Sequence, residues 1–183
     1  MLSKLYIVRH CEATGQAPEA PLTVQGTQQA QQLAEFFSTL KVDQIISSPF
    51  ERAIQSIFPF AQKTGIPIST DERLKERVLS NENLENWLEK LKASYEEMEL
   101  RYDGGESSLE ASNRIIELFE EIKRSEVKTS IIVTHGNLLS LALKYYDQAF
   151  GFSDWKKLSN PDIYLLQLDG DRVIIRRLWT GRE

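Results

Sequence analysis

The stretch Leu5-Tyr6-Ile7-Val8-Arg9-His10-Cys11-Glu12 decides the fold and locates a candidate site. Its first four residues are apolar and include β-branched side chains, a pattern that predicts a short buried strand. The run ends at a guanidinium and an imidazole, those of Arg9 and His10. Because ligands bind beyond the carboxyl ends of the strands in open parallel sheets, these two side chains stand where a binding site is expected.

Similar short apolar runs recur along the chain and alternate with segments of helical period. Strands are predicted at 44–47, 130–133, 163–168 and 173–178, and 66–69 is a further candidate. Apolar residues share one helical face within 30–40 and within 115–122. This alternation predicts an α/β fold, a three-layer α/β/α arrangement with a mainly parallel central sheet. Asp169-Gly170-Asp171 is a turn signal, so the last two strands should form an antiparallel hairpin.

Helix starts are marked by capping residues at several points. Ser48-Pro49-Phe50-Glu51 offers a serine cap, a proline at the first helical position and a glutamate three residues after the cap. Ser107-Ser108-Leu109-Glu110 is a second capping box, and Gly136-Asn137 opens another apolar helix. We therefore expect one helix to begin at each of these three segments.

The stretch 81–102 is rich in Glu and Lys but carries an apolar stripe at helical spacing, and Gly104-Gly105 ends it. We expect a helical cap insert at 81–105, which could form a short lid over the edge of the sheet. From periodicity alone, an ordinary surface helix that covers the core is the favoured interpretation. The stripe consists of Leu84, Trp87, Leu88, Leu91, Tyr95 and Met98.

Length and composition are those of an ordinary globular protein. The 183 residues predict a single domain over 1–183, and no apolar run approaches the roughly 20 residues of a membrane span. The net charge of -5 argues against nucleic-acid or membrane partners. A single cysteine excludes an internal disulfide, and the N-terminus does not resemble a signal peptide, so a cytoplasmic protein is expected. Monomer and homodimer both remain open.

The sequence contains two histidines, His10 and His135, and each directly follows a predicted strand. Arg9 precedes the first, and Arg52 lies near the start of the helix after the second strand. Two planar guanidinium groups and two imidazoles suit the tetrahedral oxygens of a phosphate monoester, and a helix N-terminus at Gly136 adds backbone donors. Each residue alone has a structural explanation, but their conjunction at three strand ends favours a dianion pocket that needs no metal ion.

The sequence does not contain the residues that other mechanisms of phosphate binding or hydrolysis require. A cysteine phosphatase needs an arginine at the end of the loop that follows its thiolate, and Ala17 stands there. The histidines have no ligand-spaced partners for a metal site, and the glycine-rich phosphate-binding loops and the serine-nucleophile elbow do not occur.

The opening stretch resembles the first strand and Arg-His-Gly motif of the histidine phosphatase superfamily, which includes the cofactor-dependent phosphoglycerate mutases. Later segments resemble the family's other motifs in the same order, along nearly the whole chain. They are Leu22–Ala30, Ile46–Ser56, Leu74-Lys75-Glu76, Gly105-Glu106-Ser107 and Val133-Thr134-His135-Gly136. The resemblance implies a phosphoglycerate mutase-like fold.

The resemblance also implies roles for particular residues. His10 would be the nucleophile, Arg9, Arg52 and His135 would clamp the phosphate, and Glu76 would donate a proton to the leaving oxygen. Gly136 and Gln16 would contact the substrate, although the family often has asparagine at the latter position.

The family's usual glycine after the nucleophile is Cys11 in this chain. Its thiol could crowd a tight backbone and sensitise the pocket to oxidants, or it could simply fill the core.

The function expected is metal-independent and cofactor-independent hydrolysis of small phosphorylated metabolites through a phosphohistidine, as a histidine acid phosphatase-type phosphoric monoester hydrolase. The mutases are longer and enclose their intermediate, whereas this chain has a short insert. Mutase-type phosphoryl transfer remains an alternative, as does a protein phosphatase that acts on phosphohistidine or phosphoserine. A non-catalytic phospholigand-binding protein is disfavoured because no motif residue is lost.

Overall fold

The protein is built around one six-stranded sheet with the strand order β3-β2-β4-β1-β5-β6. The computed structural model describes residues 2–179. The strands are β1 (Ser3–Arg9), β2 (Gln44–Ser47), β3 (Ile68–Thr70), β4 (Thr129–Thr134), β5 (Asp162–Asp169) and β6 (Arg172–Arg177). The helices are α1 (Val24–Phe37), α2 (Glu51–Thr64), the 3-10 turn η1 (Glu72–Leu74), α3 (Trp87–Glu96), α4 (Ser108–Arg124), α5 (Gly136–Tyr146) and α6 (Phe152–Trp155).

The sheet is parallel across β3, β2, β4 and β1, and antiparallel across β1, β5 and β6. This confirms the mainly parallel sheet and the terminal hairpin. Arg9, the last residue of β1, pairs with Thr134, the last residue of β4, and with Asp162, the first residue of β5. The start of an antiparallel strand therefore lies at the same edge as the carboxyl ends of the parallel strands.

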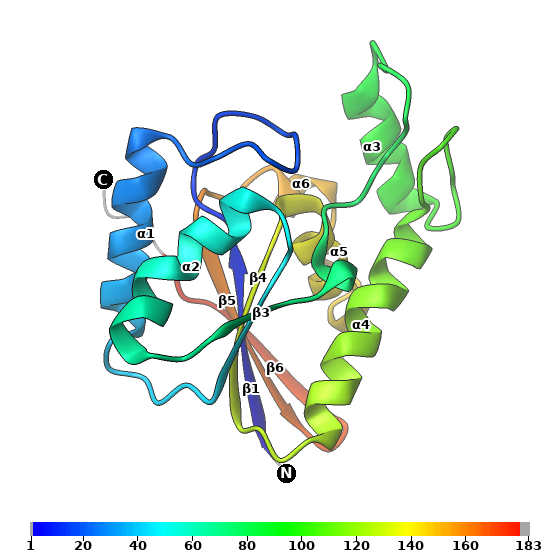
Figure 1. Ribbon diagram of the computed structural model, residues 1–183. Coiled ribbons are helices and arrows are strands. Elements are labelled where there is room, and N and C mark those ends of the chain that lie inside the picture. Colours follow the sequence, from blue (N-terminus) through cyan, green and yellow to red (C-terminus); the bar gives the residue numbers. More distant parts are fainter. Residues whose placement is uncertain (1, 180–183) are drawn as a thin grey trace.

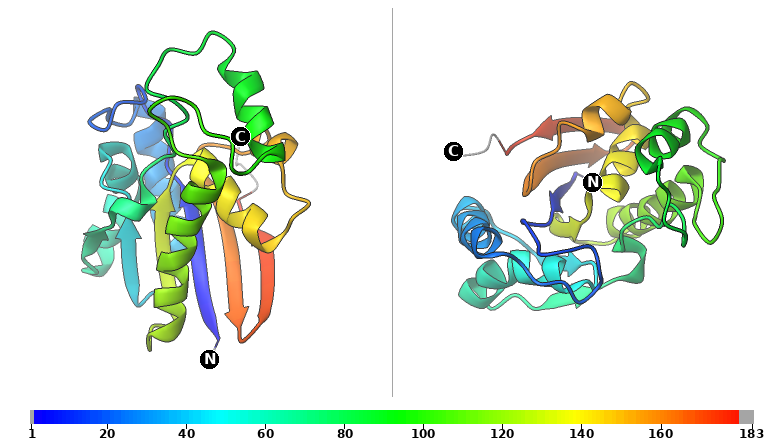
Figure 2. Two further views of the ribbon diagram at one scale, coloured as in Figure 1. Left: turned by 90° about the vertical axis from the view of Figure 1, so that its right-hand side faces the viewer. Right: turned by 90° about the horizontal axis from the view of Figure 1, so that it is seen from above.

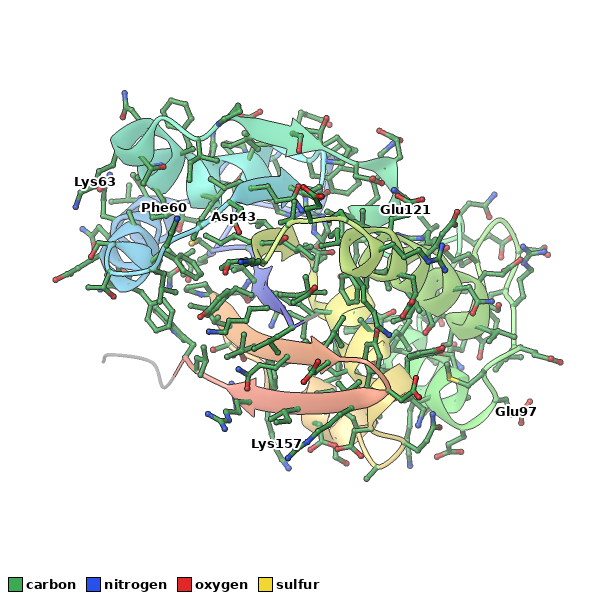
Figure 3. The ribbon with its side chains drawn as sticks, turned by 90° about the horizontal axis from the view of Figure 1, so that it is seen from below. Asp43, Phe60, Lys63, Glu97, Glu121 and Lys157 are labelled. Atoms are coloured by element: carbon green, nitrogen blue, oxygen red, sulfur yellow. The ribbon has the colours of Figure 1, made fainter. Side chains whose placement is uncertain are left out.

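Alternate residues of the strands face two separate cores, which gives the predicted three layers. One core lies between the sheet and helices α1 and α2, and the other lies between the sheet and helices α4 and α5. Leu5 and Ile7 of β1 pack into the second core, and Tyr6 and Val8 pack into the first. Figure 1 shows α1 and α2 on one side of the sheet and α4 and α5 on the other, and both views of Figure 2 agree. Seen from the opposite end, Phe60 of α2 and Glu121 of α4 lie on opposite sides (Figure 3).

The predicted capping box of α4 is confirmed. The Ser107 hydroxyl accepts a hydrogen bond from the Glu110 N–H, and the Glu110 carboxylate accepts one from the Ser107 N–H. The prediction of a cap at Ser48 is wrong, because α2 begins at Glu51 and its cap position is Phe50, without a side-chain bond. The Ser48 hydroxyl accepts from the Phe50 N–H at 3.3 Å, ahead of the helix, and it also contacts His135.

The predicted cap helix is shorter than its apolar stripe. Helix α3 covers only Trp87–Glu96, so the expectation of a helix across 81–102 is wrong. Leu91 and Tyr95 are buried, but Trp87 is 51% exposed and Leu88 is 40% exposed. The stripe therefore packs through its second half, and its first half faces solvent. In the described part of the chain, no helix combines the length and apolar character needed to cross a membrane.

Gly26 permits a close contact between α1 and the segment that follows β1. A Cβ at this position would lie 2.0 Å from the Glu12 carbonyl oxygen, which accepts a hydrogen bond from the Thr23 N–H. We expect Gly26→Ala to lower the free energy of unfolding by about 1–3 kcal/mol, because a backbone atom must move to admit the methyl group. Denaturant unfolding would measure the loss, with Gln28→Ala on the exposed face of α1 as the control. Equal stability of Gly26→Ala and the wild type would contradict the prediction.

Candidate active site

Four of the predicted site residues converge at the carboxyl edge of the sheet, which is the upper edge in Figure 1. The ring centroids of His10 and His135 lie 5.1 Å apart. The Arg52 Nε donates to His10 Nε2 at 3.2 Å. Arg9 immediately precedes His10, and a Cβ on Gly136 would lie 2.9 Å from the Arg9 Nε. The chain thus brings two imidazoles and two guanidinium groups into one cluster.

The hydrogen bonds of His10 define its tautomer. The Cys11 carbonyl oxygen lies 2.6 Å from Nδ1 and can only accept, so Nδ1 carries the hydrogen. Nε2 accepts from Arg52 and therefore keeps its lone pair on the side facing the guanidinium. Burial lowers the pKa of His10 to about 3, and the neighbouring charges of Arg52 and Arg9 act in the same direction. His10 is therefore a neutral imidazole whose one lone pair lies on Nε2 and is directed at the Arg52 Nε.

His135 is fully buried and is held by a serine. Its Nε2 lies 2.8 Å from the Ser48 hydroxyl, and the Phe50 ring packs edge-on against it with centroids 5.0 Å apart. Its Nδ1 has no hydrogen-bond partner among the described residues. Burial lowers the pKa of His135 well below 6.5, as do the nearby His10 and Arg52. His135 is thus a second neutral imidazole with one nitrogen able to bond a ligand.

Backbone carbonyl groups orient both guanidinium groups. The Arg9 Nη1 donates to the Leu158 and Ser159 oxygens at 3.1 and 3.4 Å. The Arg52 Nη1 donates to the Gln16 and Ala17 oxygens at 3.1 and 2.8 Å. Gln16 therefore contributes its carbonyl group, while the side chain named as a substrate contact belongs to an exposed residue.

Glu76 lies at the N-terminus of helix α5. Its carboxylate accepts from the N–H groups of Asn137 at 3.0 Å, Leu138 at 2.9 Å and Arg77 at 2.8 Å. Its charge raises the pKa of the Arg9 and Arg52 guanidinium groups, whose burial acts the other way. Glu76 therefore sits within electrostatic reach of both cations, at the rim of the same cluster.

A loop that no sequence motif indicated supports the cluster through Asn160 and Asp162. The Asn160 amide donates to the His10 carbonyl oxygen at 2.8 Å. The buried Asp162 carboxylate accepts from the Ser159 N–H and from the Arg177 guanidinium of β6. This loop carries the carbonyl groups that hold Arg9. Its signal was the turn segment Asn160-Pro161-Asp162 at the start of an antiparallel strand, which returns to the edge where the parallel strands end.

Cys11 is a core residue. It is fully buried, and burial raises the pKa of its thiol to about 12, while the Ser56 hydroxyl and a backbone contact act against that rise. The structure thus favours the core-filling alternative over a reactive thiol.

The cluster gathers at one edge of the sheet several groups that can bond an anion. These groups are the two guanidinium groups and the His135 Nδ1, whereas the Asn137 and Leu138 N–H groups of α5 already bond Glu76. Among residues 2–179, no group of three His, Cys, Asp or Glu side chains is arranged to hold a metal ion. Fold and cluster together define an α/β protein with the phosphoglycerate mutase-like fold and two histidines at the carboxyl edge of its sheet.

The sequence profile of the histidine phosphatase superfamily (branch 1) matches residues 5–180, and the chain belongs to this superfamily. A protein of Hydrogenobacter thermophilus, provisionally named phosphoserine phosphatase 2, is 28% identical over 154 residues, 75% of each chain. A probable phosphoglycerate mutase of Salmonella choleraesuis is 30% identical over 151 residues, 73% of this chain and 69% of the relative. A mycobacterial glucosyl-3-phosphoglycerate phosphatase superposes over 100% of both chains with a TM-score of 0.77 and 20% identity, which is a likeness of fold.

The buried neutral histidines make stability depend on pH. The unfolded chain takes up protons as pH falls through 6.5, whereas folded His10 resists protonation down to about 3. Stability should therefore fall as pH drops below 6.5, and the two histidines together predict a loss of about 2–3 kcal/mol between pH 7.5 and 5.5. Denaturant unfolding at the two pH values measures it, and His10→Gln should remove about half of the difference. An unfolding free energy independent of pH would mean that the imidazoles take up protons in the fold at the same pH as in the unfolded chain.

Proposed function

We propose that this protein is a metal-independent phosphomonoesterase that hydrolyses small phosphorylated metabolites through a phosphohistidine on His10. The observation that carries the proposal is the His10 tautomer. Nδ1–H is fixed on the Cys11 carbonyl group, and the Nε2 lone pair faces the Arg52 Nε, beside the His135 ring. A nucleophile is thus preset beside the groups that would neutralise the substrate's charge.

In the first step, His10 Nε2 forms a bond to phosphorus while the bond from phosphorus to the ester oxygen breaks. The leaving oxygen takes its electron pair and accepts a proton from Glu76, which must be in its acid form when the ester is bound, so an alcohol departs. Arg9, Arg52 and His135 stabilise the charge on the peripheral oxygens throughout the transfer. General-acid help at an alkoxide is worth about 10²–10⁴ in rate.

In the second step, water attacks the phosphohistidine. Glu76, now a carboxylate, takes the proton of the water, the bond from Nε2 to phosphorus breaks, and inorganic phosphate leaves. Glu76 returns to its acid form and His10 to its neutral imidazole, so each cycle consumes one ester and one water. Apart from the ester and the water, the proposed cycle uses only side chains of this chain.

Hydrolysis is favoured over phosphoryl transfer by the small cap. The insert contributes one ten-residue helix, α3, and its first half is exposed. A cap of this size leaves the phosphohistidine open to water, whereas a mutase must keep water out while its intermediate reorients. Phosphoryl transfer is the second candidate function, because one relative is named as a probable phosphoglycerate mutase. An assay of mutase activity with phosphoglycerates distinguishes hydrolysis from phosphoryl transfer.

We expect His10→Ala to lower kcat/KM for an aryl phosphate by at least about 1,000-fold, because the covalent route is lost. Wild-type turnover should survive prolonged treatment with a metal chelator. Acid-quench labelling with a radioactive phosphate ester should trap phosphohistidine in the wild type and not in the variant. Undiminished hydrolysis by His10→Ala would refute the mechanism.

Glu76→Gln should discriminate between leaving groups. We expect kcat/KM to fall by about 10²–10⁴ for an alkyl phosphate and by less than about tenfold for a nitrophenyl phosphate, whose leaving group needs no proton. The ratio kcat/KM is the appropriate measurement because it reports the phosphorylation step and not the later attack of water. Equal losses on both substrates would place the acid elsewhere.

A further inference from the structure

Two consecutive residues of the cap helix, Ser94 and Tyr95, make buried polar contacts in two directions. Ser94 is completely buried and Tyr95 is 4% exposed. They lie in the last turn of α3, which ends beside Glu97 (Figure 3). Buried polar groups are costly unless they are paired, so a polar pair at the base of a cap calls for an explanation.

The Ser94 contact leads to the residue after Glu76. The Arg77 Nη1 donates to the hydroxyls of Ser94 and Ser108 at 2.8 and 2.9 Å, and its Nε donates to the Glu106 carbonyl oxygen. The Ser94 hydroxyl in turn donates to the Leu91 carbonyl oxygen within α3. Arg77 is 6% exposed, so its buried guanidinium connects the segment that carries Glu76 to the cap and to the start of α4.

The Tyr95 contact leads to the other side of Glu76. The Asn137 amide donates to the Tyr95 hydroxyl at 2.9 Å, and the Ser140 hydroxyl donates to the Asn137 carbonyl oxygen at 2.6 Å. Because the Ser140 hydrogen is used there, the Tyr95 hydroxyl donates to the Ser140 oxygen. Tyr95 thereby fixes the first turn of α5, whose Asn137 N–H holds Glu76.

Both contacts converge on the same carboxylate. Arg77 and Asn137, the residues that Ser94 and Tyr95 hold, each donate a backbone N–H to Glu76. We propose that Ser94 and Tyr95 are positioning residues for Glu76, so that the base of the cap is a fixed support for the proton donor. This inference rests on the proposed function.

A purely structural role would predict different behaviour. A tie that only stabilises the cap should change stability, and its loss should affect every substrate alike. Contacts that position the Glu76 carboxyl group should raise kcat/KM for substrates whose leaving group needs a proton. Misplacement of a catalytic group by a fraction of an ångström slows the step in which that group acts. The dependence on the leaving group therefore separates the two roles.

The test is Tyr95→Phe, which removes one hydroxyl and keeps the ring that packs against Phe152. We expect kcat/KM for an alkyl phosphate to fall about tenfold and kcat/KM for a nitrophenyl phosphate to change less than about twofold. Tyr146→Phe is the matched control. Tyr146 lies on α5, the helix that Tyr95 contacts from α3, and its buried hydroxyl has no partner among the described residues. In Tyr146→Phe, kcat/KM for both substrates should therefore stay at the wild-type level.

A double-mutant cycle with Glu76→Gln completes the experiment. If Tyr95 acts through Glu76, Tyr95→Phe should have no further effect in the Glu76→Gln background. Ser94→Ala should reproduce the selective loss on the alkyl phosphate, and thermal unfolding identifies a variant that fails to fold. Equal losses on both substrates, a loss that persists without Glu76, or wild-type alkyl activity in both folded variants would overturn the positioning role. Failure of the wild type to form phosphohistidine would instead overturn the proposed function itself.

Discussion

The structure depends on keeping two imidazoles neutral beside two buried guanidinium groups. Positive charges at this density repel one another, and burial removes the water that would screen them. Burial lowers the pKa of His10 and His135, so both imidazoles stay neutral. Carbonyl oxygens and the Glu76 charge offset the positive charge of the arginines. The result is a site whose positive charge is fixed on arginine, with neutral imidazole nitrogens left for bonding and attack.

This arrangement requires support from backbone segments outside the strand of His10 and the helix of Arg52. Carbonyl groups at 16–17 and 158–159 hold the two arginines in place, and the second pair is fixed in turn by Asp162 and Arg177 of the terminal hairpin. The antiparallel strand β5 makes this possible, because its first residue lies opposite the last residue of β1. A sheet of parallel strands alone would bring no backbone back to this edge at that point.

The two predicted serine caps, Ser107 and Ser48, differ in whether their hydrogen-bond partners are close in sequence. Ser107 caps its helix as predicted because both partners of the capping box lie within three residues of it. Ser48 fits the same pattern, yet its hydroxyl bonds His135, 87 residues away in sequence, and α2 starts later. The predicted length of the cap helix was wrong for a related reason. The apolar stripe continues beyond the part that packs on the core, and periodicity does not indicate where packing ends.

The sequence by itself determined the layered α/β fold and which histidines and arginines stand at the ends of its strands, because alternation, helical period and short motifs are local properties. It also named Glu76, through resemblance and not through any local signal. The tertiary structure alone decided the His10 tautomer, the burial that keeps both histidines neutral, the carbonyl groups that orient each arginine, and the polar ties from the cap to Glu76. These features arise between segments far apart in the chain, where only folding sets the distance between a donor and its acceptor.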